Sequence, residues 1–453
     1  MRALHPRSGK DFVVPANSPR VPLFGSSGIR GLANVDVTVD LAMDVGRVLG
    51  STYGTTLVGR DPRLTGEMLA SAFIAGVLAS GADATDAGMV STPTLARGTR
   101  EYKCGAVITA SHNPAPYNGI KLWNPDGVAF DEEQQAGVEA SLARKSFGHV
   151  PWDRVGTKRS RTDLVDRHVT DILRVVGSAN LRVVVDCGSG ATSTITPRLL
   201  REMGCKVTAL NAQPDGHFPG RDPEPTEENL EMLRRTVRAT ESDLGIAHDG
   251  DGDRMVAIDE KGQFVGGDRL LPVFAKREAK KSIVVPVDTS MALDAMLVGV
   301  KVIRTRVGDV YVAQEVRRQR ADFGGESSGT WIFPRITLCP DGVYAAAHLV
   351  AIVAETPLSE LVAQAPHYPM QRGALPFPPM EREALTKKLD DVMVAIRGEV
   401  ERVDGWRVAF DDGWFLVRLS GTEPKVRITS EAHTEARAKE LYELASSKVR
   451  AAT

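Results

Sequence analysis

The segment from Thr109 to Pro114 (TASHNP) follows an expected strand at residues 106–109 and places a serine in a loop of turn-forming residues. A serine alone is a poor nucleophile and needs a base or prior activation. His112 is the next residue, and adjacent side chains in an extended segment point apart, so a simple serine–histidine dyad is not favoured. A phosphorylated Ser111 that carries phosphate, with Lys121 nearby for proton transfer, fits better. The alternative is a polar turn without chemistry.

Asp249, Asp251 and Asp253 stand at alternate positions of the segment HDGDGDR and are separated by glycines. Carboxylates in this pattern can converge on one hard cation such as Mg²⁺, because glycine lets the backbone curl tightly around the ion. A solvated acidic turn is the alternative, but three carboxylates so close would repel one another without a cation. A calcium-binding EF-hand loop is not favoured, because Arg254 stands where that loop requires glycine.

Two further segments could bind the parts of a phosphorylated sugar. Glu326 and Ser328 in the segment GGESSGT offer an acceptor and a hydroxyl for sugar OH groups. The same letters match the GxSxG pattern of hydrolases, but that pattern requires a following helix, whereas the next letters, WIFP, indicate an extended chain. Arg418 and Arg427 flank a Ser-Gly-Thr turn whose N–H groups and hydroxyls could cradle a phosphate, with bidentate bonds from arginine. An ordinary hairpin turn is the alternative.

These segments must be positioned by regular elements, and a strand-then-helix rhythm repeats along the chain. Continuous apolar strands are expected at residues 55–58, 181–185 and 282–287, each followed by a turn and a helix. Such strands alternating with helices predict largely parallel sheets covered on both faces. Polar or proline-rich stretches at residues 151–161 and 366–379 are expected to be joints. The residues after 379 are typical of a small α+β unit.

The composition fits a globular protein of several domains. The chain has 453 residues, too many for one hydrophobic core, and 42% of them are hydrophobic. A formal net charge of −2 gives no support for nucleic-acid or membrane-surface binding, which need a basic excess. No apolar segment has the length of a membrane span, and the first residues lack a signal-peptide pattern. The four cysteines show no metal-binding spacing and are expected to be reduced thiols.

Five segments in this order resemble the α-D-phosphohexomutase family over nearly the whole chain. The resemblance lies in T-A-S-H-N-P with N-G-x-K around Ser111, in D-G-D-x-D-R from Asp249, and in G-E-x-S-G from Gly325. R-x-S-G-T-E-P from Arg418 and G-x-x-G-I-R-G from Gly25 complete the set. No single segment would suffice, but the five together are specific to this family.

The resemblance implies a phosphate that moves between a sugar and a serine by way of a bisphosphate. The implied catalytic residues are Ser111, Lys121, His112 and Arg30. The implied metal ligands are Asp249, Asp251, Asp253 and an oxygen on phosphorylated Ser111. The implied substrate-binding residues are Arg254, Glu326, Ser328, Arg418, Ser420, Gly421, Thr422 and Arg427. Mg²⁺ and hexose 1,6-bisphosphate, as activator and intermediate, are the implied cofactors.

The implied fold has three similar α/β domains with mostly parallel sheets and a small C-terminal α+β domain, arranged around a central cleft. The expected domains are residues 1–150 with the phosphoserine loop, 151–250 with the metal-binding loop at its end, 251–367 with the sugar-binding loop, and 368–453 with the phosphate-binding loop. This division agrees with the three α/β units indicated by the strand–helix rhythm.

The segment RVGDVYV at residues 306–312 is similar to the phosphoglucosamine mutase branch of the family and favours glucosamine phosphate as substrate. Asp309 stands where the phosphomannomutase/phosphoglucomutase branch more often has histidine, and activity on mannose or glucose phosphate is the alternative. Thr330 departs from the Ser-Gly-His ending common in bacterial members and resembles archaeal ones. We expect a cytoplasmic monomer or homodimer that acts on a hexose phosphate and binds neither nucleic acid nor membrane.

Two other classes of function are not favoured. A sugar-phosphate-binding protein without catalysis would lack Ser111, Lys121 or a metal carboxylate, and all of these are present. A phosphatase would have no need for the phosphate-binding arginine at 418, since it does not retain and turn a bisphosphate.

Overall fold

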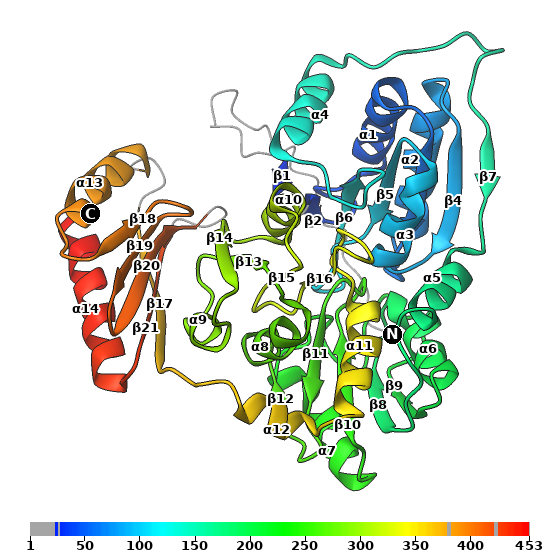
Figure 1. Cartoon of the computed structure of the whole chain (residues 1–453). Coiled ribbons are helices and arrows are strands. Elements are labelled where there is room, and N and C mark those ends of the chain that lie inside the picture. Colours follow the sequence, from blue (N-terminus) through cyan, green and yellow to red (C-terminus); the bar gives the residue numbers. More distant parts are fainter. Residues whose placement is uncertain (1–22, 26–27, 378–381, 421–424, 453) are drawn as a thin grey trace, which may run out of the picture.

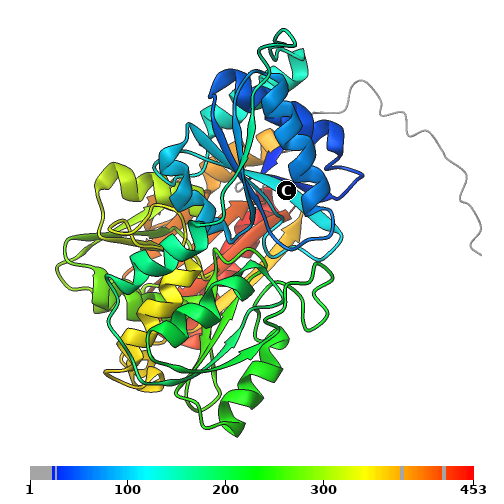
Figure 2. The same ribbon diagram turned by 90° about the vertical axis from the view of Figure 1, so that its right-hand side faces the viewer.

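The computed structural model describes residues 23–25, 28–377, 382–420 and 425–452, which form four β-sheets in series (Figure 1). The first three sheets lie between helices, whereas the fourth carries its helices on one face (Figure 1). Figure 2 shows the strands of the fourth sheet, orange to red, behind the green and yellow elements. None of the described helices is long and apolar enough to cross a membrane.

The first sheet has the strand order β1-β2-β6-β5-β3-β4-β7. Its strands are β1 (Phe24–Gly25), β2 (Gly28–Leu32), β3 (Thr56–Arg60), β4 (Ala84–Met89), β5 (Cys104–Ile108), β6 (Tyr117–Trp123) and β7 (Lys158–Ser160). The helices of this part are α1 (Val39–Thr52), α2 (Gly66–Ala79), α3 (Thr92–Gly98), α4 (Glu132–Arg144) and the short 3₁₀ turn η1 (Thr99–Glu101).

The second sheet has the order β12-β11-β10-β8-β9. Its strands are β8 (Arg182–Asp186), β9 (Lys206–Leu210), β10 (Leu244–His248), β11 (Met255–Ile258) and β12 (Phe264–Val265). The helices of this part are α5 (Leu164–Leu173), η2 (Ala191–Thr194), α6 (Thr196–Glu202), η3 (Glu228–Leu230) and α7 (Glu231–Ala239).

The third sheet has the order β14-β13-β15-β16, and the fourth is antiparallel throughout with the order β17-β21-β20-β19-β18. The strands of the third are β13 (Ser282–Pro286), β14 (Lys301–Thr305), β15 (Phe323–Gly325) and β16 (Trp331–Ile332). Its helices are α8 (Gly267–Glu278), α9 (Ala292–Met296), α10 (Asp309–Gln319), α11 (Gly342–Val353) and α12 (Leu358–Ala363). The fourth part consists of β17 (Met370–Pro376), α13 (Arg382–Val394), β18 (Glu399–Glu401), β19 (Trp406–Phe410), β20 (Gly413–Leu419), β21 (Lys425–Ala432) and α14 (Glu435–Ala452).

The first three sheets repeat one arrangement. Three neighbouring parallel strands have the spatial order second, first, third, and the next strand returns antiparallel beside the third. The returning hairpins are β5–β6, β10–β11 and β15–β16. The expected α/β fold class is confirmed. Its sheets are mixed because adjacent antiparallel strands need only a short connection, whereas parallel neighbours need a crossover.

Alternate residues of the central strands pack against opposite helical layers. In β3, Val58 belongs to the cluster formed with α1 and α2, whereas Leu57 packs with Leu95 of α3 and Leu164 of α5. In β8, Val184 packs toward α7, and its neighbours in the strand face the other side. Burial on both faces explains why these strands are continuous apolar runs in the sequence.

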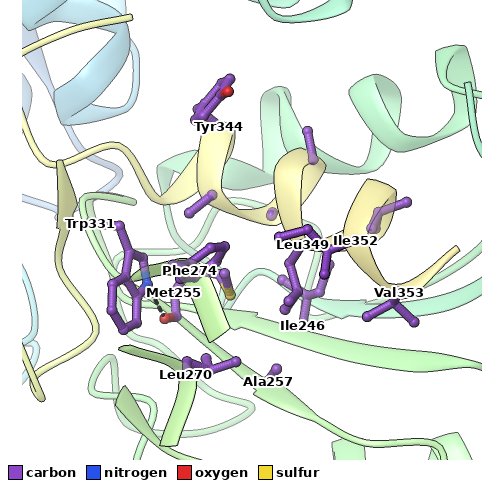
Figure 3. Close-up of a cluster of buried hydrophobic side chains, with 14 of the residues drawn as sticks. Ile246, Met255, Ala257, Leu270, Phe274, Trp331, Tyr344, Leu349, Ile352 and Val353 are labelled. Atoms are coloured by element: carbon purple, nitrogen blue, oxygen red, sulfur yellow. Dashed lines mark hydrogen bonds between the residues drawn. The ribbon is translucent and has the colours of Figure 1, made fainter. Parts of the chain in front are cut away.

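The second and third sheets share one hydrophobic core (Figure 3). Ile246 and Met255 come from the second sheet, and Phe274, Trp331 and Leu349 come from elements of the third. Each large side chain buried there contributes roughly 1.5–3 kcal/mol. The indole Nε1 of Trp331 also donates to the carbonyl of Met255 at 2.8 Å. The hairpins β10–β11 and β15–β16 are therefore fixed relative to each other.

Two stretches expected to be joints contain strands. β7 pairs in parallel with β4, within the stretch at residues 151–161. β17 pairs with β21 along its whole length within the stretch at 366–379, and its proline at 376 is tolerated because β17 is an edge strand. The first sheet thus extends past residue 150, and the second extends past residue 250 to Val265. The domain boundaries given above stay a prediction.

Candidate functional site

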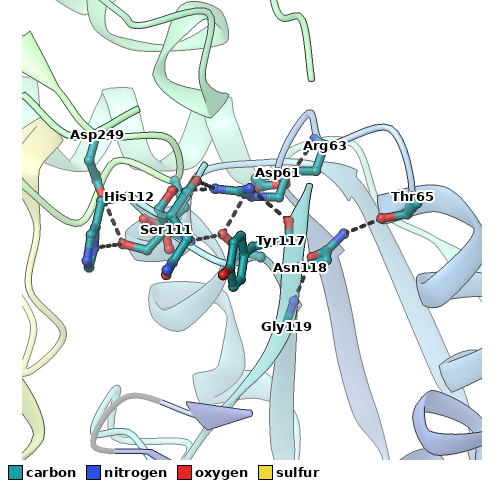
Figure 4. A network of polar contacts seen from close by, with 12 residues as sticks. Asp61, Arg63, Thr65, Ser111, His112, Tyr117, Asn118, Gly119 and Asp249 are labelled. Carbon is teal, nitrogen blue, oxygen red and sulfur yellow. Dashed lines mark hydrogen bonds and ion pairs between the residues drawn. The ribbon is translucent and has the colours of Figure 1, made fainter. Parts of the chain in front are cut away.

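Ser111 lies in the loop of the β5–β6 hairpin in a strained backbone conformation. Its φ of 52° is in the left-handed region, which a non-glycine residue adopts at a cost and mostly at functional sites. The N–H of Ser111 donates to Thr109 Oγ1 at 2.8 Å, and that hydroxyl donates to Asp61 at 2.6 Å. The Ser111 hydroxyl donates to Asp249 Oδ2 at 2.7 Å (Figure 4). The hydroxyl is therefore aimed at the carboxylates of the second sheet.

A buried arginine, Arg63, holds the serine loop in this shape (Figure 4). Its Nε pairs with Asp61 at 3.0 Å. Its remaining N–H groups donate to carbonyls within 2.6–2.8 Å, and these belong to Ser111, Asn113, Pro114 and Tyr117. One planar guanidinium thus satisfies four carbonyls in and beside the loop, a task for which arginine is better suited than lysine.

The side chains of Ser111 and His112 approach each other, contrary to the expectation for adjacent residues. His112 Nδ1 lies 3.3 Å from Ser111 Oγ. The expectation assumed an extended segment, whereas the left-handed φ of Ser111 turns the chain. Burial, together with the charges of Arg254 and Arg30, lowers the pKa of His112 to about 2, so its imidazole is neutral at physiological pH.

Asp249, Asp251 and Asp253 converge in the loop of the β10–β11 hairpin, as their spacing predicts. Each is buried, and one oxygen of each lies within 4.8 Å of the others. Gly252 permits the tight turn with a φ of 79°, and a Cβ there would meet Thr192 at 2.4 Å. In the described part of the chain, Oδ1 of Asp251 and of Asp253 are buried without a hydrogen-bond partner. Such an all-oxygen set with unused acceptors fits a hard divalent cation.

Lys121 of β6 provides the positive charge nearest to this cluster. Its Nζ lies 2.8 Å from Asp251 Oδ2 and 2.5 Å from Asp253 Oδ2. Burial alone would lower the pKa of Lys121, but these two carboxylates raise it above its ordinary value. Burial alone would raise the pKa of Asp251, but the Lys121 ammonium holds it below its usual range. Burial and the charges of Asp253 and Asp251 raise the pKa of Asp249.

Two partly buried guanidiniums lie beside the serine and the carboxylates. Arg30 of β2 donates to Asn113 Oδ1 at 3.0 Å, and Arg254 pairs with Glu224 at 3.3 Å. Burial is the larger cause that lowers the pKa of Arg30, and repulsion from the Arg254 charge is the next. Two cations held close together form a concentration of positive charge that suits an anion such as a phosphoryl group.

Glu326 and Ser328 lie side by side in the loop of the β15–β16 hairpin. Glu326 accepts from the N–H of Gly308 at 2.8 Å, from Thr330 Oγ1 at 3.0 Å and from Ser328 Oγ at 3.3 Å. Burial and the neighbouring charge of Asp309 raise the pKa of Glu326 to about 7. An isolated β-bridge between Arg254 and Thr330 connects this loop directly to the loop that carries the three aspartates.

Arg418 and Arg427 are directly opposite each other on β20 and β21. Arg418 pairs with Asp404 at 2.9 Å, and Asp404 also accepts from the N–H of Val307 at 3.1 Å, so the fourth sheet touches the third. Ser420 is buried, and its N–H donates to the carbonyl of Lys425 at 2.8 Å. Gly421 and Thr422 were also expected to bind phosphate, and they lie outside the described residues.

The residues expected to form a site fall into two groups. One group joins three hairpin loops and consists of Arg30, Ser111, His112, Lys121, Asp249, Asp251, Asp253, Arg254, Glu326 and Ser328. The other lies on the fourth sheet and consists of Arg418, Ser420 and Arg427. The roles expected for these residues stay predictions.

Sequence reasoning missed three residues that hold the first group together. Asp61 and Arg63 lie in the segment that the sequence predicts to be a turn. The sequence feature that could have indicated their role is a pair of opposite charges directly after an apolar strand. Thr92 gave no signal, although its hydroxyl donates to Asp251 Oδ2 at 2.6 Å and its N–H donates to the Asp251 carbonyl at 2.8 Å. Contacts of this kind depend on distant parts of the chain and have no local pattern.

Four family descriptions match successive parts of the chain. Phosphoglucomutase/phosphomannomutase alpha/beta/alpha domains I, II and III match residues 21–149, 166–262 and 266–368. The phosphoglucomutase/phosphomannomutase C-terminal domain matches residues 378–445. Together they span most of the chain.

Relatives and solved structures agree with this match. A protein of Methanosarcina acetivorans named "Probable phosphoglucosamine mutase" is 53% identical over 433 residues, covering 95% of this chain and 99% of its own. One of the same name from Methanopyrus kandleri is 45% identical, covering 92% and 95%. A phosphoglucomutase/phosphomannomutase family protein of Burkholderia thailandensis has a similar structure, with a TM-score of 0.86, 28% identity and coverage of 96% and 98%. N-acetylphosphoglucosamine mutase of Aspergillus fumigatus, solved with GlcNAc-6P and magnesium, shares the fold at 15% identity, with a TM-score of 0.57 and 95% coverage of both chains.

Arg63→Lys should loosen the serine loop, because an ammonium cannot reach the four carbonyls that the planar guanidinium satisfies. We expect the free energy of unfolding to fall by about 2 kcal/mol or more. Amide hydrogen exchange at residues 111–117 should become faster. Arg60→Lys, in the neighbouring exposed pair with Glu67, is the control and should change neither quantity. Unchanged exchange in Arg63→Lys would show that the loop does not depend on this side chain.

Mg²⁺ should stabilise the wild-type protein because it would bind the carboxylate cluster of the folded state. At about 100 times its Kd, we expect a gain of about 2.7 kcal/mol in the free energy of unfolding, measured in urea. Asp253→Asn should lose most of this gain, whereas Asp215→Asn, a partly exposed carboxylate outside the cluster, should keep it. An equal gain in Asp253→Asn would place the Mg²⁺ site elsewhere.

Because folding raises the pKa of Glu326, the free energy of unfolding of the wild-type protein should fall as the pH rises. A carboxyl whose pKa is raised by folding binds its proton more tightly in the folded state, so stability is lost between its ordinary pKa near 4.5 and about 7. Relative to Glu326→Gln, which does not titrate, the wild type should lose about 3 kcal/mol between pH 4 and pH 8. Urea unfolding of both proteins across this range measures the difference, and a constant difference would contradict the raised pKa.

Proposed function

The chain belongs to the phosphoglucomutase/phosphomannomutase family, and we propose that this isomerase interconverts glucosamine 6-phosphate and glucosamine 1-phosphate through a phosphorylated Ser111. The observation that carries the proposal is the hydrogen bond from Ser111 Oγ to Asp249 Oδ2 at 2.7 Å. It joins the serine of one hairpin to the buried carboxylate cluster of another, as phosphoryl transfer from serine requires. The names of the archaeal relatives support the choice of sugar.

Phosphate transfer begins with phosphorylated Ser111 and a hexose monophosphate. The free hydroxyl oxygen of the sugar bonds to phosphorus, the bond from phosphorus to Ser111 Oγ breaks, and a hexose 1,6-bisphosphate results. The sugar hydroxyl loses a proton, and the serine oxygen gains one. Lys121 and the neutral imidazole of His112 are the titratable groups placed for these transfers. The bisphosphate then reorients within the site, and its other phosphate is transferred to Ser111 by the reverse step.

The charged residues stabilise the phosphoryl group during the transfer. Arg30 and Arg254 present positive charge that does not have to be reorganised as the reaction proceeds. The family implies a metal ion, and Asp249, Asp251 and Asp253 would hold Mg²⁺, which when bound supplies positive charge to the phosphoryl oxygens. Phosphorylated Ser111 would add a ligand oxygen.

The sugar and its second phosphate bind away from the serine. Glu326 accepts hydrogen bonds from the sugar hydroxyls, and Ser328 donates to them. Gly308 and Thr330 already orient the Glu326 carboxylate. The distal phosphate binds at the fourth sheet, through Arg418, Ser420, Gly421, Thr422 and Arg427. Asp404 neutralises Arg418 before the substrate arrives. The enzyme works in the cytoplasm, as a monomer or homodimer, without nucleic acid or membrane.

Ser111→Ala should lower turnover at least a thousandfold, because the phosphate carrier is lost, while the chain still folds, with a loss of about 1–3 kcal/mol in the free energy of unfolding from the hydrogen bond to buried Asp249. Mass spectrometry of the wild-type protein after incubation with hexose 1,6-bisphosphate should find one phosphoryl group on the peptide with Ser111. Near-normal activity of Ser111→Ala would contradict the mechanism.

The choice of sugar is tested by coupled assays with Mg²⁺ and a trace of hexose 1,6-bisphosphate. Glucosamine 6-phosphate, mannose 1-phosphate and glucose 1-phosphate are compared at equal enzyme concentration. The highest kcat/KM is expected for glucosamine phosphate. A preference for mannose or glucose phosphate would replace the substrate but keep the mechanism.

A further inference from the structure

A buried histidine outside the site described above connects three separate parts of the chain. Nδ1 of His168 in α5 lies 2.8 Å from the hydroxyl of Thr94 in α3. Nε2 of His168 lies 3.0 Å from Oδ2 of Asp341, the residue that precedes α11. Thr94, His168 and Asp341 are 1%, 2% and 0% exposed. In a neutral imidazole, the Nε2–H donates to the carboxylate and Nδ1 accepts from the hydroxyl.

The connectivity matches that of a nucleophile, a base and an orienting carboxylate, but the hydroxyl is already engaged within the protein. Thr94 Oγ1 lies 2.8 Å from His168 Nδ1 and 2.7 Å from Ser91 Oγ, so its donor and one acceptor position are both used. The network therefore holds α5 to α3 at one end and to the start of α11 at the other.

The threonine end of the network leads to the carboxylate cluster. α3 begins at Thr92, two residues before Thr94, with Ser91 as its cap. The hydroxyl of Thr92 donates to Asp251 Oδ2 at 2.6 Å, and its N–H donates to the Asp251 carbonyl at 2.8 Å. The position of α3 therefore sets the position of Asp251.

The aspartate end leads to the same loop from the other side. Asp341 Oδ1 accepts from the N–H of Tyr344 at 2.8 Å and so caps α11. The first residue of α11, Gly342, lies against the loop backbone so closely that a Cβ would meet the carbonyls of Arg254 at 2.5 Å and Gly252 at 2.8 Å. The loop at residues 249–254 is thus confined between the beginnings of α3 and α11.

We propose that His168 is a positioning residue for the metal-binding loop: by joining Thr94 to Asp341, it sets the spacing between α3 and α11 and thereby holds Asp251 in place for a divalent cation. This inference rests on the proposed function only in taking that cation to be Mg²⁺. Imidazole suits the task because its two nitrogens point to opposite sides of a rigid ring. Outer residues that orient metal ligands affect metal affinity by 10- to 100-fold.

The test is the Mg²⁺ affinity of the intact protein, measured by isothermal calorimetry well below the unfolding temperature. Thr94→Val removes the hydroxyl without changing side-chain volume much, and His168→Gln retains one of the two contacts. Each should weaken Mg²⁺ binding about tenfold or more. Thr94→Ser should restore wild-type affinity because it restores the hydroxyl.

Asp171→Asn is the matched control. Asp171 of α5 pairs with Arg97 of α3 at 2.9 Å, so it joins the same two helices as His168 does but does not contact α11 or the metal-binding loop through a described hydrogen bond. This variant should bind Mg²⁺ within twofold of the wild type.

Wild-type Mg²⁺ affinity in Thr94→Val and His168→Gln would overturn the proposal, even if both variants were less stable, because the network would then support only the fold. Equal weakening in Asp171→Asn would also overturn it, since any loosening of α3 from α5 would have the same effect. Turnover of hexose phosphates by the wild type is assayed separately. Loss of the proposed function with Mg²⁺ binding intact would leave the role of His168 standing.

Discussion

The electrostatic repulsion among three buried carboxylates is the constraint on which the rest of this site depends. One oxygen each of Asp249, Asp251 and Asp253 lies within 4.8 Å of the others. Two like charges about 4 Å apart repel by about 4 kcal/mol even at an effective dielectric constant of ~20. The structure offsets this cost with Lys121 and the hydroxyls of Ser111 and Thr92, which come from distant segments, and with the N–H groups of Gly252 and Arg254 in the same loop. Ser111 and Lys121 belong to the same β5–β6 hairpin, so these two contacts also hold the serine beside the carboxylates.

The repeated sheet arrangement explains how loops so far apart in the sequence meet. Each of the first three sheets places its functional loop in the hairpin that follows the third parallel strand. The isolated β-bridge between Arg254 and Thr330 and the hydrogen bond from Trp331 to Met255 fix two of these hairpins together. The hydrogen bond from Ser111 to Asp249 adds the remaining hairpin. The fourth sheet meets the third part through Asp404, through the contacts of Glu431 with Ser290 and Met291, and through a small apolar cluster of Val287, Trp414 and Leu416.

Local patterns were sufficient for most elements and insufficient where pairing is distant. The strands expected at residues 181–185 and 282–287 are observed within one residue of those bounds as β8 and β13, because apolar runs with β-branched residues carry a local signal. β7 and β17 were read as joints, because their residues are exposed and polar or rich in proline and they are stabilised by partners elsewhere in the chain. His112 was expected to point away from Ser111, because a sequence does not reveal a left-handed φ at a serine.

The α/β class and the carboxylate spacing follow from residues that are neighbours in the chain, and the order of five such segments identifies the family. How the segments cooperate depends on the folded chain. It placed Arg63 under the serine loop, Lys121 between two carboxylates, and His168 between Thr94 and Asp341. A buried charge or hydroxyl is tolerated only where a partner meets it. The partners here come from segments up to 173 residues apart, so only the folded chain identifies them.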